Sequence, residues 1–351
     1  VASASFGPTQ TDPTSGVSLH ETYLWQAPGI ACPVPISGAG HRRERTKRGA
    51  MNQQSLSAFI WSVADLLRGD YKQSEYGRVI LPFTVLRRLD CVLAPTKAAV
   101  LAEKTKREAA GLNPEPFLLR VAGQSFYNTS PLDMKTLMGD QDHIRENLYS
   151  YLQAFAPAVR DVFERFEFHA QVERLARSGL LYRVVEKFAN IDLHPQRVSN
   201  HQMGLVFEEL IRKFAEISNE TAGEHFTPRE VIRLMVNLIF VEDDDVLSRP
   251  GVVRTLYDPT AGTGGMLSIA GEYLAEHNPE ARLTVFGQEL NPESYAICKA
   301  DMVIKGQDVA NIAFGNTLSD DGHSGKAFDY MLSNPPFGVE WKKVEKEVRK
   351  E

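Results

Sequence analysis

Residues 252–265 read VVRTLYDPTAGTGG, a β-branched run that ends in an aspartate, followed by a glycine-rich turn. The next residues, Met266–His277, are apolar at helical spacing, so the stretch predicts a strand that passes through a tight turn into a helix. Glycine lets the chain turn sharply there and lets a ligand approach the main chain at the helix N-terminus. The stretch therefore predicts an open α/β sheet with a ligand site above the end of strand Val252–Tyr257.

The same alternation continues downstream. Leu283–Glu289, Ile312–Phe314 and Phe328–Leu332 read as strands, and Pro292–Lys305 reads as a helix between two of them. Short strands that alternate with helices specify a parallel sheet with crossover helices. We therefore assign residues 196–351 to an α/β domain with a Rossmann-like parallel sheet.

The chain upstream of the sheet is predicted to be helical. Apolar residues recur at spacings of three and four, the pattern of a helix with one buried face. The stretches with this pattern are Leu56–Leu67, Val79–Leu93, Ile144–Ala154, Val159–Phe166, Leu181–Phe188, Met203–Ile217 and Val231–Phe240. We assign residues 51–195 to a mostly helical N-terminal domain, with loops around Gly111–Pro116 and Asn128–Asp133. Residues 1–50, rich in Ser, Thr, Pro and Gly, are predicted to be a disordered tail without an assigned function.

Composition limits the classes of function. A length of 351 residues suits two domains with tails, and no run of apolar residues is long enough for a membrane helix, so we expect a cytoplasmic protein. Three cysteines form neither a disulfide framework nor a zinc spacing, and the acidic run Glu242–Asp245 is predicted to be a solvated loop, so no metal site is expected. A net charge of −6 argues against a protein that grips nucleic acid unaided.

Two features of the glycine-rich turn indicate its ligand. Its glycines do not follow the G-x-G-x-x-G spacing of dinucleotide sites, and Asp258 at the strand end would repel a pyrophosphate but could accept from the ammonium of a methionine moiety. Glu289 ends the next strand, within reach of the ribose hydroxyls of an adenosine ligand. An adenosine-type ligand is favoured, although such a turn can also be purely structural.

A second polar segment follows the last predicted strand. Asn334 and Pro335 offer an amide oxygen and a carbonyl that can each accept one hydrogen of an exocyclic adenine amine, which turns the nitrogen lone pair outward. Pro335 and Pro336 fix the backbone, and the ring of Phe337 offers a stacking face for a flipped-out base. The alternative is an ordinary Asn-Pro-Pro turn followed by a buried Phe.

These segments, together with residues 223–229 (Gly-Glu-His-Phe-Thr-Pro-Arg), closely resemble the modification (methyltransferase) subunit of type I restriction-modification systems over about residues 51–351. The resemblance implies an S-adenosylmethionine-dependent methyltransferase fold. It also implies a site-specific DNA methyltransferase that transfers a methyl group from S-adenosylmethionine to the N6 atom of a flipped-out adenine.

The resemblance also implies which residues act. The cofactor contacts would come from Glu224, His225, Phe226, Thr227, Pro228, Arg229, Asp258, Thr260, Ala261, Gly262, Thr263, Gly264, Glu289 and Asn316. Methyl transfer would rest on Asn334, Pro335, Pro336 and Phe337, and no metal is implied. Many relatives carry Asp at the position of Asn316, but an amide can both donate and accept, so we expect binding to survive.

The partners implied are DNA, a specificity subunit and a second modification subunit. The resemblance leaves a restriction subunit open and implies no membrane. Members of the family continue far beyond the Asn-Pro-Pro-Phe segment, where they complete the sheet and form helices that dock on the specificity subunit. We therefore expect the sheet of this chain to be incomplete at its C-terminus and the chain to be inactive alone.

Two other classes of function stay open at this stage. Protein-glutamine and ribosomal-RNA amino methyltransferases resemble this chain in their Asn-Pro-Pro segment, but they have a short N-terminal domain and favour Tyr where Phe337 stands. A catalytically incomplete assembly component is the third hypothesis. A cytosine-C5 enzyme is disfavoured, because no cysteine follows a proline in the predicted active-site region.

Overall fold

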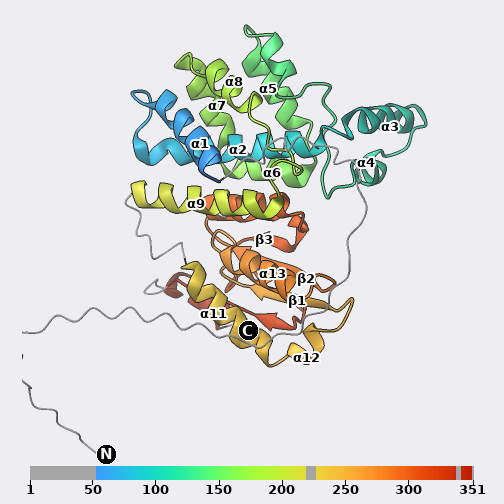
Figure 1. Ribbon diagram of the computed structural model, residues 1–351, viewed down its shortest axis with the longest axis vertical. Helices are drawn as coiled ribbons and strands as arrows, with labels where there is room; N and C mark the ends of the chain where they lie inside the picture. Colours follow the sequence, from blue (N-terminus) through green and yellow to red (C-terminus); the bar gives the residue numbers. More distant parts are fainter. Residues whose placement is uncertain (1–52, 219–226, 337–340, 350–351) are drawn as a thin grey trace, which may run out of the picture. The chain divides into compact units, whose positions relative to one another are not determined.

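A run of helices precedes the sheet in the computed structural model, which describes residues 53–218, 227–336 and 341–349 (Figure 1). The helices are α1 (Gln53–Leu67), α2 (Tyr76–Leu93), α3 (Lys97–Ala109), α4 (Glu115–Ala122), α5 (Ile144–Gln153), α6 (Pro157–Arg165), α7 (Phe168–Arg177), α8 (Leu181–Ala189) and α9 (Asn200–Ser218). Short 3₁₀ helices, η1 (Gln73–Glu75) and η2 (Thr136–Gly139), lie among them.

Apolar residues at helical spacing explain why these helices pack together. In α8, Leu181, Val184, Val185 and Phe188 are all buried on one face. The ring of Phe188 stacks on that of Phe83 from α2, with 5.3 Å between the ring centroids. Periodicity in the sequence therefore predicted this part of the core correctly.

Helix α9 joins the helical region to the sheet region, because it packs both on α1 and α2 and on α14 (Pro292–Lys305). The approach to α9 is fixed by Arg88, whose fully buried guanidinium donates to the carbonyls of Leu193 and Val198 and, at 2.6 Å, to Oδ1 of Asn200. Asp161 on α6 adds a second link by accepting from Lys299 of α14. The two regions are thus one packed body.

Four parallel strands form the sheet in the order β3-β2-β1-β4. They are β1 (Val253–Asp258), β2 (Arg282–Glu289), β3 (Ile312–Phe314) and β4 (Tyr330–Met331). The crossover from β1 to β2 runs through α13 (Gly265–His277), and that from β2 to β3 runs through α14 and η3 (Val309–Asn311). The predicted α/β class with a parallel, Rossmann-like sheet is confirmed.

Strand β4 is shorter than the predicted range Phe328–Leu332. Instead of a backbone ladder at its start, the Asp329 carboxylate accepts from both the amide N and Oγ1 of Thr255 at 2.7 Å. Backbone bonding resumes where the Leu332 amide donates to the Tyr257 carbonyl. The polar clasp holds β4 beside β1 and delivers the residues after Leu332 to the end of the sheet.

Some elements differ from the predictions. Helices α3, α4 and α7 were not predicted, and α4 begins at Glu115, inside the loop expected around Gly111–Pro116. The acidic run expected as a loop ends in the short helix α12 (Asp244–Leu247), where Asp244 pairs with His277. Beyond the sheet lie η4 (Trp341–Val344) and α15 (Glu345–Val348), while the tail predicted for residues 1–50 lies outside the described residues.

No helix within residues 53–218, 227–336 and 341–349 has the length and apolar character needed to cross a membrane.

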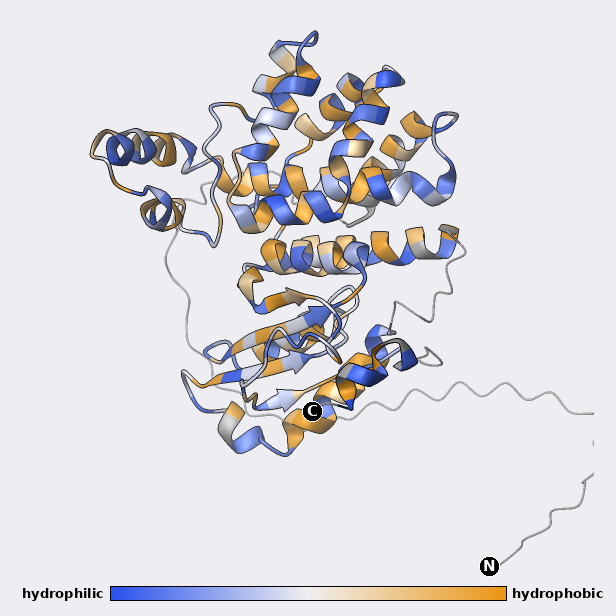
Figure 2. Ribbon diagram, turned by 180° about the vertical axis from the view of Figure 1, so that it is seen from behind, coloured by the Kyte–Doolittle hydropathy of each residue, from blue (hydrophilic) through white to orange (hydrophobic). Residues whose placement is uncertain are grey.

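Helix α11 (Arg229–Val241) carries apolar residues on two faces (Figure 2). Val236 is completely buried, whereas Leu238 on the other face is 62% exposed.

We expect Val236→Ala to lower the free energy of unfolding by roughly 1–3 kcal/mol, because it leaves a cavity in the core. The matched change Leu238→Ala should alter it by less than about 0.5 kcal/mol. Urea denaturation measures both, and equal losses would contradict this assignment of the two faces.

Candidate active site

The ends of three neighbouring strands bring the polar segments together. Strand β1 ends at Asp258 and β2 at Glu289, while the chain leaves β4 through Leu332 toward Asn334. Because β1 lies between β2 and β4, all three ends meet at the carboxyl edge of the sheet. The hydroxyls of Thr260 and Ser333, 2.7 Å apart, connect the glycine-rich turn to the Asn-Pro-Pro segment.

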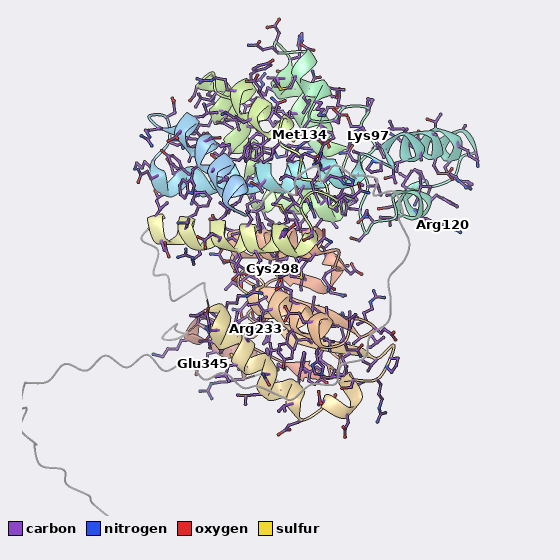
Figure 3. All side chains as sticks on the ribbon, in the orientation of Figure 1. Lys97, Arg120, Met134, Arg233, Cys298 and Glu345 are labelled. Atoms are coloured by element: carbon purple, nitrogen blue, oxygen red, sulfur yellow. The ribbon has the colours of Figure 1, made fainter. Side chains whose placement is uncertain are left out.

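The glycine-rich turn needs glycine for two separate reasons. Gly262 and Gly264 have φ angles of 54° and 84°, in the left-handed region that other residues disfavour. In addition, a Cβ at position 264 would lie 2.8 Å from Sγ of Cys298. Cys298 lies on α14 and is labelled in Figure 3. The turn therefore packs directly on α14, while Thr260, Ala261, Gly262 and Thr263 also line the pocket described below.

Glu289 holds this turn in place. One of its carboxylate oxygens accepts from the amide of Gly262 at 2.8 Å, and the other accepts from the amide of Asn291 at 2.7 Å. Each oxygen keeps a further lone pair that could accept from a ribose hydroxyl. Glu289 does not line the pocket described next, so in this structure its observed contacts are those that shape the turn.

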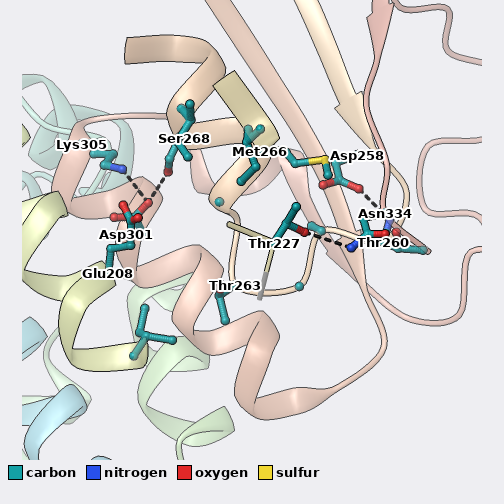
Figure 4. Close-up of a pocket in the computed structure, with 16 residues that line it drawn as sticks. Glu208, Thr227, Asp258, Thr260, Thr263, Met266, Ser268, Asp301, Lys305 and Asn334 are labelled. Carbon is teal, nitrogen blue, oxygen red and sulfur yellow. Dashed lines mark hydrogen bonds and ion pairs between the residues drawn. The ribbon is translucent and has the colours of Figure 1, made fainter. Parts of the chain in front are cut away.

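A pocket opens between the turn, α9, α11, α13 and the Asn-Pro-Pro segment (Figure 4). The predicted site residues that line it are Thr227, Asp258, Thr260, Ala261, Gly262, Thr263 and Asn334. Ile232 and Met266 add apolar walls. The structure thus brings the predicted cofactor turn and the predicted catalytic amide to one cavity.

Asp258 is the most unusual group in this pocket. It is 2% exposed, it accepts from the amide of Thr260 at 3.0 Å, and no described cation forms an ion pair with it. The pKa of its carboxyl is raised from 3.8 to about 7, chiefly by burial; the hydrogen bond from the Thr260 amide lowers this pKa, and the nearby Glu289 carboxylate raises it. A buried carboxylate without a cation fits a ligand that brings its own positive charge, as an ammonium or sulfonium does.

Asn334 stands at the outer side of the pocket and is itself exposed. Its Nδ2 donates to Oγ1 of Thr227 at 3.0 Å. Pro335 and Pro336, also exposed, continue the chain from it. Phe337 and the three predicted cofactor residues Glu224, His225 and Phe226 lie outside the described residues.

Other predicted residues do not line the pocket. The guanidinium of Arg229 forms ion pairs with Glu208 of α9 at 2.9 Å and with Glu272 of α13 at 2.5 Å. Oδ1 of Asn316 accepts from the amide of Leu318 at 3.0 Å, within its own turn. Pro228 and Gly264 are helix N-caps, of α11 and α13 respectively, and contribute backbone rather than side-chain contacts.

Sequence reasoning missed the inner end of the pocket. Glu208, Ser268, Asp301 and Lys305 line it together. Nζ of Lys305 lies 3.0 Å from Asp301 and 3.4 Å from Glu272; burial lowers the pKa of Lys305, but these two carboxylates outweigh it and raise the pKa overall. The only local signal was the four-residue spacing of Asp301 and Lys305 on α14, which is typical of any exposed helix.

No group of three or more His, Cys, Asp or Glu side chains in the described part of the chain is placed to hold a metal ion.

Comparison with known proteins shows which families the helical region and the sheet region resemble. A family model described as N-6 DNA Methylase matches residues 198–351, and the model of the HsdM N-terminal domain matches residues 56–188. The type I restriction enzyme MjaIX methylase subunit of Methanocaldococcus jannaschii is 23% identical over 80% of this chain and 51% of its own length. The EcoEI methylase subunit of Escherichia coli is 24% identical over 67% and 48%.

A solved structure agrees in fold. The type I restriction-modification system methyltransferase subunit from Streptococcus thermophilus superposes with a TM-score of 0.61 at 23% identity, over 85% of this chain and 67% of that one. The sheet region thus has the fold of the S-adenosylmethionine-dependent methyltransferases. Over residues 56–188 and 198–351 the chain is thus similar to the methylase subunits of type I restriction-modification systems, and this similarity implies S-adenosylmethionine as the cofactor. It spans about half the length of the curated relatives it matches.

Replacing Asp258 by Asn should stabilise the ligand-free protein in a pH-dependent way. Because the pKa is about 7 in the folded chain and 3.8 is the ordinary value, the wild type loses stability as the pH rises from about 4 to about 7. At about 1.4 kcal/mol per pKa unit, the advantage of Asp258→Asn should be roughly 2–3 kcal/mol larger at pH 8 than at pH 5. Urea denaturation at the two pH values tests this, and an advantage independent of pH would contradict it.

Proposed function

We propose that this chain carries the catalytic site of a site-specific DNA adenine-N6 methyltransferase. The single observation that carries the proposal is that Asp258 and Asn334, from the ends of β1 and β4, line the same pocket. The Asp258 carboxylate could bind the cation of a methyl donor, and the Asn334 amide oxygen could accept a hydrogen from the amine of a methyl acceptor. The names of the curated relatives, methylase subunits of type I restriction enzymes, support the same conclusion.

For the cofactor, the methyl group would come from the sulfonium of S-adenosylmethionine. The Asp258 carboxylate would accept from the ammonium of the methionine part, and the left-handed turn at Gly262 and Gly264 would let the ligand approach the main chain. Glu289, with one lone pair free on each oxygen, would accept from the ribose hydroxyls. In these roles Asp258 and Glu289 would retain the hydrogen bonds to backbone amides that the structure shows.

For the target base, Oδ1 of Asn334 and the carbonyl of Pro335 would each accept one hydrogen of the adenine amine. Two acceptors on one amine localise its lone pair, which is otherwise delocalised into the ring. Exposure of Asn334, Pro335 and Pro336 leaves room for a base that has been flipped out of a duplex. Phe337 would provide the stacking face.

DNA and other subunits are the partners of this proposal. The relatives are named as subunits, and the net charge of −6 gives the chain little electrostatic grip of its own. A specificity subunit would select the sequence, a second modification subunit would complete the assembly, and a restriction subunit remains an open partner. The match of residues 56–188 to the HsdM N-terminal domain favours this assembly over protein-glutamine or ribosomal-RNA methylation, for which a short N-terminal domain is expected.

Asn334→Ala should abolish methyl transfer and leave cofactor binding nearly unchanged, because it removes one of the two acceptors for the target amine and no proposed cofactor contact. We expect the rate to fall by at least about 10²-fold. Transfer of a labelled methyl group to unmethylated DNA, by the complex of the chain with its specificity partner, gives the rate. Titration calorimetry with S-adenosylmethionine gives the affinity, and rapid methylation by the variant would refute the assignment.

Affinity for S-adenosylmethionine should fall as the solution is made acidic. Only the ionised form of Asp258 attracts an ammonium, and a carboxyl whose pKa is about 7 in the free protein is largely protonated at pH 5.5. We expect binding about twentyfold weaker at pH 5.5 than at pH 7.5, in proportion to the ionised fraction. Asp258→Asn is the control, with weak binding at both pH values. A wild-type affinity that does not change with pH would exclude Asp258 as the cation's partner.

A further inference from the structure

We propose that Thr227 is a positioning residue that fixes the orientation of the Asn334 amide, and that Arg229 anchors Thr227 for this purpose. The inference rests on the proposed function, since it concerns the same amide. Sequence reasoning assigned both Thr227 and Arg229 to the cofactor. Thr227 lines the pocket, and its side chain also contacts the catalytic segment, while Arg229 contacts the helices behind it.

An asparagine side chain has two different ends, and only one suits the target amine. An oxygen in the direction of the base accepts a hydrogen from it, whereas an NH₂ group there would set donor against donor. The two orientations differ by a half-turn of one soft torsion, so a lone asparagine selects between them weakly. Nδ2 of Asn334 donates to Oγ1 of Thr227 at 3.0 Å, which leaves Oδ1 as the free end.

Thr227 can set this orientation because it is itself held. Pro228 directly after it restricts the backbone and is the N-cap of α11. Arg229, one residue further, lies between two carboxylates from different helices, Glu208 of α9 and Glu272 of α13. Its side chain is only 22% exposed, so these ion pairs are partly shielded from water.

The anchor also relates the amide to the cofactor turn. Glu272, which pairs with Arg229, lies on α13, the helix that begins at Gly265 directly behind the glycine-rich turn. Glu272 is fixed in turn by Lys305 of α14 at 3.4 Å. Asn334, Thr227 and the turn are therefore held by one continuous set of contacts, which keeps the acceptor oxygen in register with the methyl donor.

A pair of variants at position 227 tests the inference. Thr227→Ser keeps the hydroxyl, whereas Thr227→Val keeps the shape and removes the acceptor. In the complete DNA-methylating complex we expect Thr227→Val to lower kcat by about tenfold, the effect of one lost hydrogen bond, with affinity for S-adenosylmethionine within about twofold of the wild type. Thr227→Ser should restore kcat. A weaker cofactor affinity with unchanged kcat, or no change in either quantity, would overturn the inference.

A second readout does not depend on catalysis. In protein labelled with ¹⁵N at asparagine, the side-chain amide resonance of Asn334 is identified by its loss in Asn334→Asp. Exchange of this amide with solvent should be slower in the wild type and in Thr227→Ser than in Thr227→Val. Equal exchange in all three would overturn the inference even if the enzyme methylates DNA. Undiminished methylation by Asn334→Ala would instead refute the proposed function, so the two failures are distinguishable.

Arg229→Lys tests the anchor. A single ammonium cannot reproduce the forked contact with Glu208 and Glu272, so kcat should fall by a few-fold while cofactor affinity is kept. The fall should be absent when Thr227 is already Val, because both changes act on the same amide. Additive losses in the double variant would show that Arg229 acts independently of Thr227 and would overturn this part of the inference.

Discussion

The Asp258 carboxylate sits at the buried end of β1, where it accepts from one backbone N–H and has no cation beside it within the described residues. Burying a charge in this way is unfavourable, and the raised pKa of Asp258 reflects that. The contacts of the adjoining turn hold the Asp258 carboxylate at this buried position. The turn must pack on Cys298 of α14, and Glu289 holds it there, so the strand end cannot move toward solvent. A cationic ligand would stabilise the ionised form of this buried carboxyl.

The rest of the buried charge near the pocket is handled differently. Arg229 and Lys305 lie among the carboxylates of Glu208, Glu272 and Asp301, and every one of these groups has an opposite charge within 3.4 Å. The helices that contribute them, α9, α11, α13 and α14, belong to both the helical and the sheet regions. Ion pairs thus connect the helical and sheet regions beside the pocket, whereas Asp258 pairs with no cation among the described residues, as a site for a cationic ligand would require.

Local patterns in the sequence predicted the sheet well and the surroundings of the pocket poorly. β-branched runs and helical periodicity gave β1, β2, β3, α13 and α14 to within a residue or so, because each buries a regular face. Helix α3 was missed because, of its residues, only Val100 is fully buried, so its apolar period is faint. The contact of Arg229 with Glu272 joins residues 43 positions apart, and that of Ser268 with Asp301 joins residues 33 apart, so neither could be predicted from local spacing.

Two residues that line the pocket differ in exposure: Asp258 is buried, whereas Asn334 is exposed. Asp258 lines the pocket but is only 2% exposed, so water would weaken its attraction for a small cation very little. Asn334, Pro335 and Pro336 are exposed, which a base attached to a polymer requires. Exposure also leaves an amide free to rotate unless something holds it. In the proposed site, the hydrogen bond from Asn334 to Thr227 would keep this exposed amide in one orientation. The ion pairs of Arg229 would in turn hold Thr227 in place.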